Sequence, residues 1–232
     1  MLCFPSICAE GVADLKELLI IKVGGSSISS PDLKVWIESI EQTIRPVVLV
    51  PGGGPFADTV RRYQKVIGFD DDAAHHMAIL AMEQFGRAIV SLGNRLVAVA
   101  TKEAIRKALS ENKIPVWMPA KLALRAGEIG RNWSVTSDSL AAWLAGQFSG
   151  CSLCLIKQLD LPEGSTLHAI SRAGVVDQAF ARLLHEETAV YIAGPGDLRL
   201  AGRRLAIGNV PGHAIVRDDK SGNGGSVAEA AE

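Results

Sequence analysis

Two glycine-rich segments, each placed directly after a short apolar run, are the part of this sequence that points to chemistry. Residues 18–23 (LLIIKV) lead into residues 24–26 (GGS), and residues 47–50 (VVLV) lead into residues 52–54 (GGG). Glycine lets the backbone approach an anion closely, so that its N–H groups can donate to phosphate oxygens. The ammonium group of Lys22 is a point charge suited to a phosphoryl group in transfer. The pattern predicts two phosphate sites.

The length and composition of the chain set bounds on its class. A chain of 232 residues, 48% of them hydrophobic, is long enough for one sizeable α/β domain or for two lobes that share a continuous sheet. Its 24 basic and 25 acidic side chains give a net charge of -1, without a long run of one sign. This balance argues against nucleic acid or an anionic membrane as a partner, so we expect any affinity for anions to be local.

The two ends of the chain give the expected location and the extent of the domain. Residues 1–11 have no basic start and no uninterrupted apolar stretch. They fit neither a secretory signal nor a membrane span, and a cytoplasmic location is expected. Residues 218–232 hold Gly, Ser and Ala but almost no large apolar side chain. This composition predicts a disordered tail, which leaves residues 1–217 as a single domain.

Strand-like and helix-like patterns alternate along the chain. Apolar runs are followed by stretches with apolar residues at the 3.6-residue spacing of a helix. Strands or extended pieces are expected at residues 18–23, 47–50, 115–119, 151–157, 189–192 and 214–216. Helices are expected at residues 32–40, 55–63, 71–85, 101–110, 136–144 and about 175–185. Strand, loop and helix repeated in this order predict a parallel sheet with helices on its faces.

Cys151 and Cys154 form a CxxC pair inside a strand-like run. Residues i and i+3 of a strand face opposite sides of the sheet, which is a poor geometry for a metal site or a redox pair. We therefore expect two buried, unreactive cysteines. Four other large side chains are likewise expected in the core and not against a cofactor: Trp133, Trp143, Met77 and Met82.

Two common nucleotide-binding patterns match the sequence poorly. Residues 52–57 (GGGPFA) fit the GxGxxA pattern of a Rossmann site, but that fold needs an acidic residue at the end of a second strand about 20 positions on. Here the acidic residues 70–72 lie between two predicted helices. No GxxxxGK[ST] segment of a P-loop occurs either. Hydride chemistry is therefore a weak alternative, and a P-loop enzyme is disfavoured.

A third element completes a pattern that spans residues 18–217. Residues 136–139 (TSDS) can open a helix, and residues 151–157 (CSLCLIK) form a strand that ends in a lysine. Together with the two glycine segments, in this order and spacing, these elements resemble the amino-acid kinase superfamily. The resemblance implies an α/β fold, a three-layer αβα sandwich with a central, mostly parallel sheet. In such a fold about residues 18–125 would bind the acceptor and about 126–217 the nucleotide.

The same resemblance implies roles for individual residues, with ATP and Mg²⁺ as cofactors. Lys22 and a second lysine, Lys157, would stabilise the phosphoryl group in transfer, and Asp138 would order both lysines. The first glycine loop would hold the nucleotide phosphates, and the second would cradle the acceptor. No protein ligand for a metal is assigned. By matching positions, the nucleotide side comprises Gly24, Gly25, Ser26, Thr136 and Ser137, and the acceptor side comprises Gly52, Gly53, Gly54 and His75.

The chemistry of phosphoryl transfer agrees with this trio of charged residues. Negative charge spreads over the equatorial oxygens of the group in transfer, and two lysines on opposite sides can stabilise it. A carboxylate between two ammonium groups keeps both charged and in place. Taken singly, a lysine at a strand end often reaches to solvent, and an aspartate at a helix start often only caps the helix. Their joint occurrence with two glycine loops favours the functional interpretation.

Two further stretches narrow the resemblance within the superfamily. Residues 74–82 (AHHMAILAM) and 133–145 (WSVTSDSLAAWLA) are similar to the branch that phosphorylates aminomethylfuran-methyl phosphate in methanofuran biosynthesis. The implied acceptor is a small phosphate monoester, which is already anionic and needs no general base. His75 and His76 point about 100° apart on a helix, so one of them at most faces the site, and His75 is the candidate. The acidic residues 70–72 are expected near an ammonium group of the acceptor.

One stretch departs from the family pattern. Where the family usually carries an Asp-Val-Asp-Gly turn after the strand, residues 158–162 read QLDLP, which leaves the nucleotide preference open. An isopentenyl phosphate kinase-like or uridylate kinase-like activity is an alternative, as is a non-catalytic nucleotide-binding storage or regulatory protein. Retention of Lys22, Asp138 and Lys157 favours an enzyme. A homo-oligomer is expected.

Overall fold

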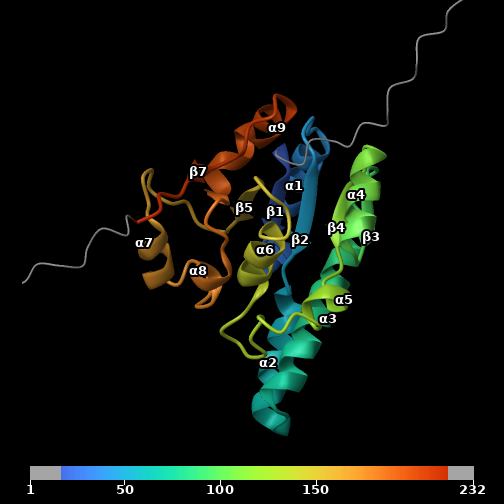
Figure 1. Cartoon of the computed structure of the whole chain (residues 1–232), viewed down its shortest axis with the longest axis vertical. Coiled ribbons are helices and arrows are strands. Elements are labelled where there is room, and N and C mark those ends of the chain that lie inside the picture. The colour runs from blue at the N-terminus through green and yellow to red at the C-terminus, as the bar shows by residue number, and fades with distance from the viewer. Residues whose placement is uncertain (1–16, 219–232) are drawn as a thin grey trace, which may run out of the picture.

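The computed structural model describes residues 17–218 of the chain (Figure 1). The expectations for residues 1–11 and for the tail from residue 219 onward concern segments outside the described residues. In the part of the chain that is described, no helix is both long enough and apolar enough to cross a membrane.

A seven-stranded sheet forms the centre of residues 17–218. Its strands follow the spatial order β3-β4-β2-β1-β5-β6-β7, and all neighbours pair in parallel except β7, which is antiparallel to β6. The strands are β1 (Leu19–Val23), β2 (Val47–Pro51), β3 (Leu96–Val99), β4 (Ile114–Trp117), β5 (Ser152–Ile156), β6 (Ala189–Ala193) and β7 (His213–Ala214). The predicted, mostly parallel sheet is confirmed.

The central strand β1 brings the two predicted phosphate loops to one edge of the sheet. Val23, the last residue of β1, pairs with Pro51 of β2 on one side and with Ile156 of β5 on the other. The chain segments that follow these three strands therefore leave the sheet side by side. In parallel α/β sheets, ligands bind beyond the carboxyl ends of the strands at such a point.

Helices cover both faces of the sheet (Figure 1). The longer helices are α1 (Asp32–Glu41), α2 (Gly54–Ile67), α3 (Asp71–Val90), α4 (Lys102–Ser110), α6 (Ser137–Ala145) and α9 (Leu198–Ala206). The shorter helical elements are η2 (Gly25–Ser29), α5 (Ala120–Ala123), α7 (Leu167–Arg172), α8 (Phe180–Leu183) and η3 (Pro195–Asp197). Helices α1 and α9 contact each other.

Buried side chains of β1 alternate between two apolar clusters, one on each face of the sheet. Leu19 and Ile21 belong to the cluster that includes Trp36 of α1 and Leu205 of α9, whereas Ile20 belongs to the cluster that includes helix α6. Every residue of β1 is buried, which is typical of a parallel strand covered on both faces. The predicted three-layer arrangement is therefore confirmed.

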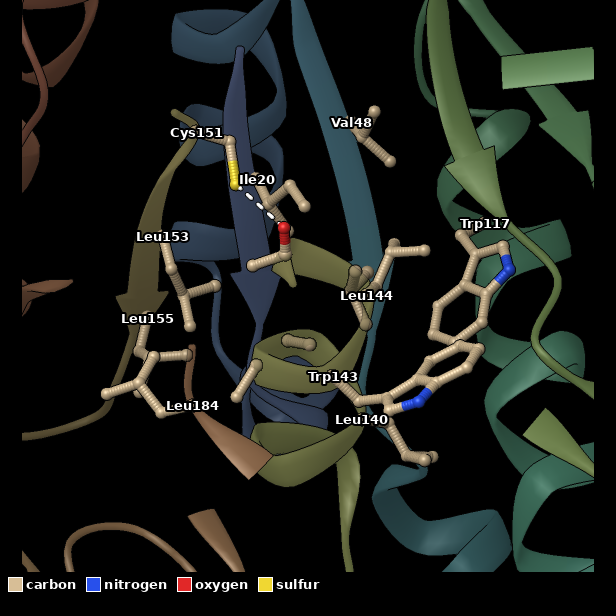
Figure 2. Packing of buried hydrophobic residues seen from close by; sticks show 14 of the residues in the cluster. Ile20, Val48, Trp117, Leu140, Trp143, Leu144, Cys151, Leu153, Leu155 and Leu184 are labelled. Carbon is tan, nitrogen blue, oxygen red and sulfur yellow. Dashed lines mark hydrogen bonds between the residues drawn. The ribbon is translucent and has the colours of Figure 1, made fainter. Parts of the chain in front are cut away.

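Helix α6 is buried on all sides, and its first turn consequently lies in the interior. Each residue of α6 is buried. Leu140, Trp143 and Leu144 pack in the cluster beside β1 and β5, and the ring of Trp143 stacks on Trp117 with the ring centroids 6.1 Å apart (Figure 2). Removal of this apolar surface from water holds the helix against the sheet. A charged side chain in its first turn needs a partner inside the protein.

The cysteine prediction is confirmed. Cys151 and Cys154 are free and buried, and they belong to the clusters on opposite faces of the sheet. Burial raises the pKa of the Cys151 thiol to about 11, and it raises the pKa of the Cys154 thiol as well. Both thiols are therefore protonated and unreactive near neutral pH. Trp143 and Met82 are buried as expected, whereas Met77 is exposed.

The expected helix over about 175–185 is wrong. Only residues 180–183 of this region are helical, as α8, and residues 173–179 between α7 and α8 are not helical. Gly174 has a φ of +66°, a left-handed conformation that ends α7 and that side-chain-bearing residues rarely adopt. Strand β3 and helix α9 are additional elements that the apolar pattern did not predict.

Candidate active site

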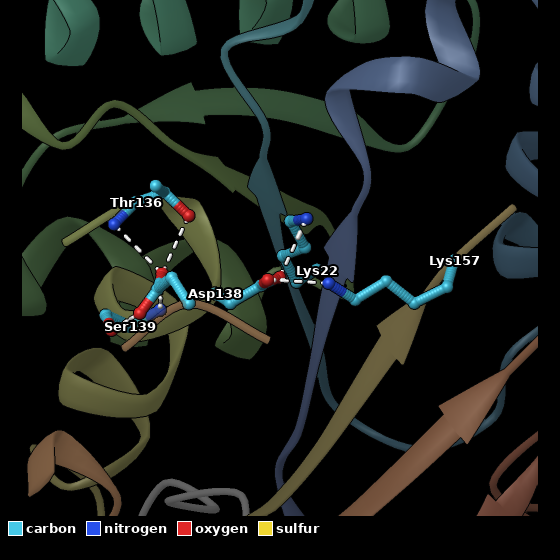
Figure 3. A network of polar contacts seen from close by, with 6 residues as sticks. Lys22, Thr136, Asp138, Ser139 and Lys157 are labelled. Carbon is cyan, nitrogen blue, oxygen red and sulfur yellow. Dashed lines mark hydrogen bonds and ion pairs between the residues drawn. The ribbon is translucent and has the colours of Figure 1, made fainter. Parts of the chain in front are cut away.

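Three charged side chains meet beyond the carboxyl ends of β1 and β5. Lys22, near the end of β1, places its Nζ 2.8 Å from Oδ1 of Asp138. Lys157, directly after β5, donates a hydrogen bond from Nζ to Oδ2 of Asp138 across 2.6 Å (Figure 3). The structure thus brings together the three residues that were predicted to be catalytic.

The trio is removed from water and carries an excess positive charge. Lys22 and Asp138 are each 5% exposed. Burial by itself raises the pKa of Asp138, but Lys22 and Lys157 outweigh burial and hold this pKa below its ordinary value. Buried charges are costly unless they are paired, and one carboxylate pairs here with two ammonium groups. The remaining positive charge suits a polyanion at this edge of the sheet.

The pKa of Lys157 is lowered, and several groups contribute. Burial has the largest effect, and the neighbouring ammonium group of Lys22 lowers the pKa of Lys157 further. Asp138 and Asp177 act in the opposite direction and favour the charged form of this lysine. Burial and Lys22 on one side, and the two carboxylates on the other, therefore set how much of Lys157 is charged at a given pH.

The two glycine loops pack backbone against backbone. A Cβ atom on Gly25 would clash with the backbone nitrogen of Gly54, and a Cβ atom on Gly52 would clash with the backbone nitrogen of Gly25. Gly54 also has a φ of +53°, in the left-handed region. The backbone N–H of Gly52 donates to the carbonyl of Val23 at 2.9 Å. Gly52 therefore links the second loop to the end of β1, and its N–H is not available to a substrate that accepts a phosphoryl group.

A cavity of about 280 Å³ lies beside the two loops. Its inner wall combines backbone from both loops with the start of α6, and its apolar wall comprises Ile79, Met82 and Leu140. Of the predicted phosphate and acceptor residues, the cavity is lined by Gly25, Ser26, Gly53, Gly54, His75, Thr136 and Ser137. Gly24 and Gly52 are not among its lining residues.

The outer wall of the cavity was missed by the sequence-based prediction. Arg61 of α2 lies over the ring of Trp133, with Cζ 4.2 Å from the ring centroid, and its Nη1 donates to Oδ1 of Asp58 at 2.9 Å. The indole N–H of Trp133 donates to Oε1 of Gln64 at 2.6 Å. Asp58, Arg61 and Trp133 all line the cavity, so the expected core position of Trp133 is wrong. An aromatic side chain in a polar loop was the signal that could have indicated this wall.

The histidine pair is divided between the cavity and the surface. His75 is 5% exposed and lines the cavity, whereas His76 is exposed. Burial, helped by the charge of Arg131, lowers the pKa of His75. His75 is therefore neutral at pH 7 and can both donate and accept a hydrogen bond.

The acidic start of α3 does not face the cavity, contrary to expectation. Oδ1 of Asp70 accepts from the backbone N–H of Ala73 at 2.8 Å and caps the helix. The other two carboxylates are engaged elsewhere: Asp71 accepts from Gln64, and Asp72 pairs with Arg131 at 2.7 Å. The carboxylate that lines the cavity is Asp58.

Asp177 is a further residue at the site that was not selected from the sequence. Its Oδ2 accepts from the backbone N–H of Thr136 at 2.9 Å, from the Thr136 hydroxyl at 2.7 Å and from the backbone N–H of Ser139 at 3.1 Å. Its Oδ1 accepts from the Ser139 hydroxyl. The helix predicted over this segment would have placed Asp177 on an ordinary helix surface.

The unusual turn after β5 is held by two polar contacts. Nε2 of Gln158 donates to the hydroxyl of Ser27 at 3.0 Å, which ties the turn to the first glycine loop. Oδ1 of Asp160 accepts from the backbone N–H of Gly196 at 2.9 Å. The segments that follow β1, β5 and β6 are thereby connected to one another.

Fold and site together define a phosphotransferase. Residues 17–160, more than half of the chain, match the model of the Amino acid kinase family. The chain belongs to this family and is an enzyme of the phosphotransferase class.

Two known proteins illustrate the relationship. The chain is 26% identical over 179 residues to [5-(aminomethyl)furan-3-yl]methyl phosphate kinase of Methanocaldococcus jannaschii, an alignment that covers 72% of this chain and 82% of the relative. The crystal structure of uridylate kinase from Archaeoglobus fulgidus has a similar fold, with a TM-score of 0.59 and 16% identity. That match covers 85% of this chain and 99% of the uridylate kinase chain.

Proposed function

We propose that the enzyme transfers the γ-phosphoryl group of ATP to a small phosphate monoester. The observation that carries this proposal is the carboxylate of Asp138, which holds the ammonium groups of Lys22 and Lys157 at the edge where both glycine loops meet. A fixed cluster of positive charge beside glycine backbone is suited to the charge that develops in phosphoryl transfer.

The charged residues of the site would stabilise and orient the reacting groups without taking part in a covalent bond. An oxygen of the acceptor phosphate forms a bond to the γ-phosphorus, and the bond from that phosphorus to the bridging oxygen breaks, which releases ADP. Lys22 and Lys157 would stabilise the oxygens that gain charge, while Asp138 keeps both ammonium groups oriented. A dianionic phosphate oxygen has no proton to lose, so no side chain has to act as a general base.

The site fits the phosphates of a nucleotide, which supplies the group to be transferred. The first glycine loop, with Gly24, Gly25 and Ser26, and the start of α6, with Thr136 and Ser137, would hold these phosphates. In the described residues no three His, Cys, Asp or Glu side chains are grouped so that they could hold a metal ion. Both oxygens of Asp138 already bind lysines. Mg²⁺ would therefore be bound mainly by the nucleotide phosphates and water, as is common for this ion.

The proposed acceptor is aminomethylfuran-methyl phosphate. The relative from Methanocaldococcus jannaschii bears the name of a kinase for such a compound, and the cavity offers matching chemistry. Gly53 and Gly54 would hold the reacting phosphate, and the apolar wall would contact the furan ring. His75 would contact the acceptor in its neutral form, and Asp58 at the outer wall would face the ammonium group. We further propose that residues 18–125 form most of the acceptor lobe and residues 126–217 most of the nucleotide lobe, with Leu140 contacting the acceptor from the second lobe.

The chain is further proposed to form a homo-oligomer. Phe56, Met77 and Leu80 are exposed and line a shallow apolar groove between α2 and α3. Light scattering coupled to size-exclusion chromatography gives the mass in solution; a monomer at micromolar concentration would contradict this part of the proposal.

An acceptor screen tests the proposed function. The protein is incubated with ATP, Mg²⁺ and, separately, aminomethylfuran-methyl phosphate, isopentenyl phosphate, UMP or acetylglutamate, and ADP release is followed. We expect the highest kcat/KM with aminomethylfuran-methyl phosphate. Preference for UMP or isopentenyl phosphate would reject the acceptor but retain the kinase site. Bound nucleotide without ADP release from any acceptor would favour a storage or regulatory protein.

A further inference from the structure

We propose that Asp177 is a positioning residue for phosphoryl transfer, because it fixes the first turn of α6 from outside the helix and thereby the carboxylate of Asp138. The inference rests on the proposed function of the trio Lys22, Asp138 and Lys157. It concerns a residue 39 positions after Asp138 in the sequence, in the segment between α7 and α8.

The N-cap residue of helix α6 does not itself cap the helix. Thr136 occupies the N-cap position in extended backbone, but its side chain accepts no hydrogen bond from the first turn. The first N–H groups of a helix have no partner within the helix, and an N-cap oxygen normally accepts from the second or third of them. Asp177 supplies that acceptor, since its Oδ2 binds the N–H of Ser139, the third residue of α6.

The contacts of Asp177 lie on both sides of Asp138. Its carboxylate accepts from the backbone and hydroxyl of Thr136 and from the backbone and hydroxyl of Ser139. Asp138 lies between these two residues, so the backbone that carries its side chain is fixed before and after it. Figure 3 shows Thr136 and Ser139 beside Asp138, which in turn reaches the two lysines.

The segment that carries Asp177 is itself hydrogen-bonded to the loop that precedes α6. The N–H of Ala179 donates to the carbonyl of Ser134 at 3.1 Å, and Nη1 of Arg182 donates to the carbonyl of Glu128 at 3.2 Å. The N–H of Phe180 donates to the carbonyl of Asp177 at 3.1 Å. Phe180 is fully buried in the cluster around α6. Asp177 is therefore held in place by the contacts of its own segment, residues 177–182, as well as by its hydrogen bonds to the start of α6.

Asp177 also acts on the charge of Lys157. The charged groups that face Lys157 are Lys22 from β1, Asp138 from α6 and Asp177 from the segment after α7. Asp177 raises the pKa of Lys157, in opposition to burial and Lys22. Loss of the Asp177 charge therefore lowers this pKa further, and Lys157 would lose its proton at a lower pH than in the wild-type enzyme.

The first experiment measures turnover of the full-length chain with ATP, Mg²⁺ and aminomethylfuran-methyl phosphate. Asp177→Asn should lower kcat by about tenfold or more, because a small displacement of a reacting group is costly, while the KM for the acceptor changes much less. The alkaline decline of kcat should move to lower pH. Thr101→Ala is the matched control, because it removes the N-cap of α4, where Thr101 accepts from Ala104 at 3.1 Å away from the site.

A purely structural role predicts a different result. Asp177→Asn would then lower the melting temperature, as is expected for Thr101→Ala, but leave kcat and its pH profile unchanged in the folded protein. That outcome would overturn the proposal. Should Asp177→Asn fail to fold, Asp177→Glu and Ser139→Ala replace it. Both variants disturb the contacts of residue 177 with α6, so both should lower kcat. Both keep the charge of residue 177, so the alkaline decline of kcat should not move. Wild-type kcat in both variants would overturn the proposal.

A second measurement needs no substrate and separates this inference from the proposed function. The Lys157 ammonium group is titrated by NMR in ¹³C-lysine-labelled protein, with its signal assigned by its loss in Lys157→Met. The titration midpoint should be lower in Asp177→Asn than in the wild type. An unchanged midpoint would reject the action of Asp177 on Lys157, even if no acceptor is ever turned over. A lowered midpoint in a protein without kinase activity would instead reject only the proposed function.

Discussion

Lys157 and Asp138 form a hydrogen bond of 2.6 Å that joins the end of β5 to the first turn of α6. The contact is almost completely shielded from water, and the second oxygen of the same carboxylate faces Lys22. Asp138 therefore connects Lys22, on β1, with Lys157, directly after the neighbouring strand β5. This relationship leads to specific expectations for variants of the site.

Replacement of Lys22 by alanine should lower kcat by on the order of 100-fold or more, with a much smaller change in nucleotide affinity. The reason is that its charge meets oxygens that become more negative in the transition state than in bound ATP. Steady-state kinetics and nucleotide titration by calorimetry give the two quantities. Lys34→Ala, on the exposed face of α1, removes the same charge away from the site and should leave both unchanged. An unaltered kcat in Lys22→Ala would remove Lys22 from the mechanism.

Asp138→Asn should reduce turnover without removing an ionisation near neutral pH from the rate profile. The pKa of Asp138 is held below its ordinary value, so the group is fully ionised at neutral pH and does not act as a base. If the wild-type rate instead followed one ionisation near pH 7 that vanishes in Asp138→Asn, general-base catalysis by Asp138 would be the better account.

The same lowered pKa predicts how stability depends on pH. A carboxylate whose pKa is lower in the folded than in the unfolded protein stabilises the fold above its ordinary pKa of about 4, and this contribution is lost as the pH falls through the folded-state pKa. The free energy of unfolding, measured by urea titration, should therefore fall on acidification below about pH 4. The part of this decline due to Asp138 should be absent in Asp138→Asn, and equal slopes in the two proteins would contradict the assignment.

Gly52→Ala should destabilise the protein by about 1–3 kcal/mol, because a new Cβ would clash with the Gly25 backbone and force the two loops apart. Gly127→Ala is the matched control, since a Cβ at Gly127 meets nothing within 4 Å. Urea unfolding compares the two variants. Equal stabilities would show that the close packing of the glycine loops is not needed for the fold.

Asp58→Asn should weaken discrimination for the ammonium group of the acceptor. The side chain of Asp58 is 69% exposed, so the effect on kcat/KM should be modest, about two- to fivefold, and confined to acceptors that carry the ammonium group. The matched acceptor is furan-methyl phosphate with a methyl group in place of the aminomethyl group. Glu38→Gln, on the exposed face of α1, controls for the change in net charge. Equal losses with both acceptors would exclude a contact between Asp58 and the ammonium group.

The sequence predicted the fold class and the charged centre of the site, whereas β3, α9 and the segment around 175–185 were missed or wrong. The apolar runs of β1, β2 and β5 are continuous because those strands are buried on both faces, and the residues at their ends follow from the parallel order. The meeting of Lys22, Asp138 and Lys157 was predicted from the resemblance to the amino-acid kinase superfamily, whose pattern these positions match.

The outer wall and the support of α6 could not be predicted in this way. Trp133 and Asp177 lie in segments without a regular pattern, and Arg61 lies on the predicted helix α2. The contacts of all three depend on how α2, the 127–136 loop and the segment after α7 pack against one another. Gly174 is left-handed and ends α7, and residues 173–179 are not helical, so Asp177 does not lie on the helix that was expected over about 175–185. The acidic residues 70–72 were misjudged because their partners, Gln64 and Arg131, come from other elements.

The most direct test of the central claim is ³¹P NMR of the complete reaction with ATP, Mg²⁺ and aminomethylfuran-methyl phosphate. The account predicts that the acceptor's single phosphate resonance is replaced by two mutually coupled diphosphate resonances while ADP accumulates in equal amount, and that both changes are lost in Lys22→Ala. Formation of inorganic phosphate with an unchanged acceptor resonance, or full conversion by Lys22→Ala, would contradict it.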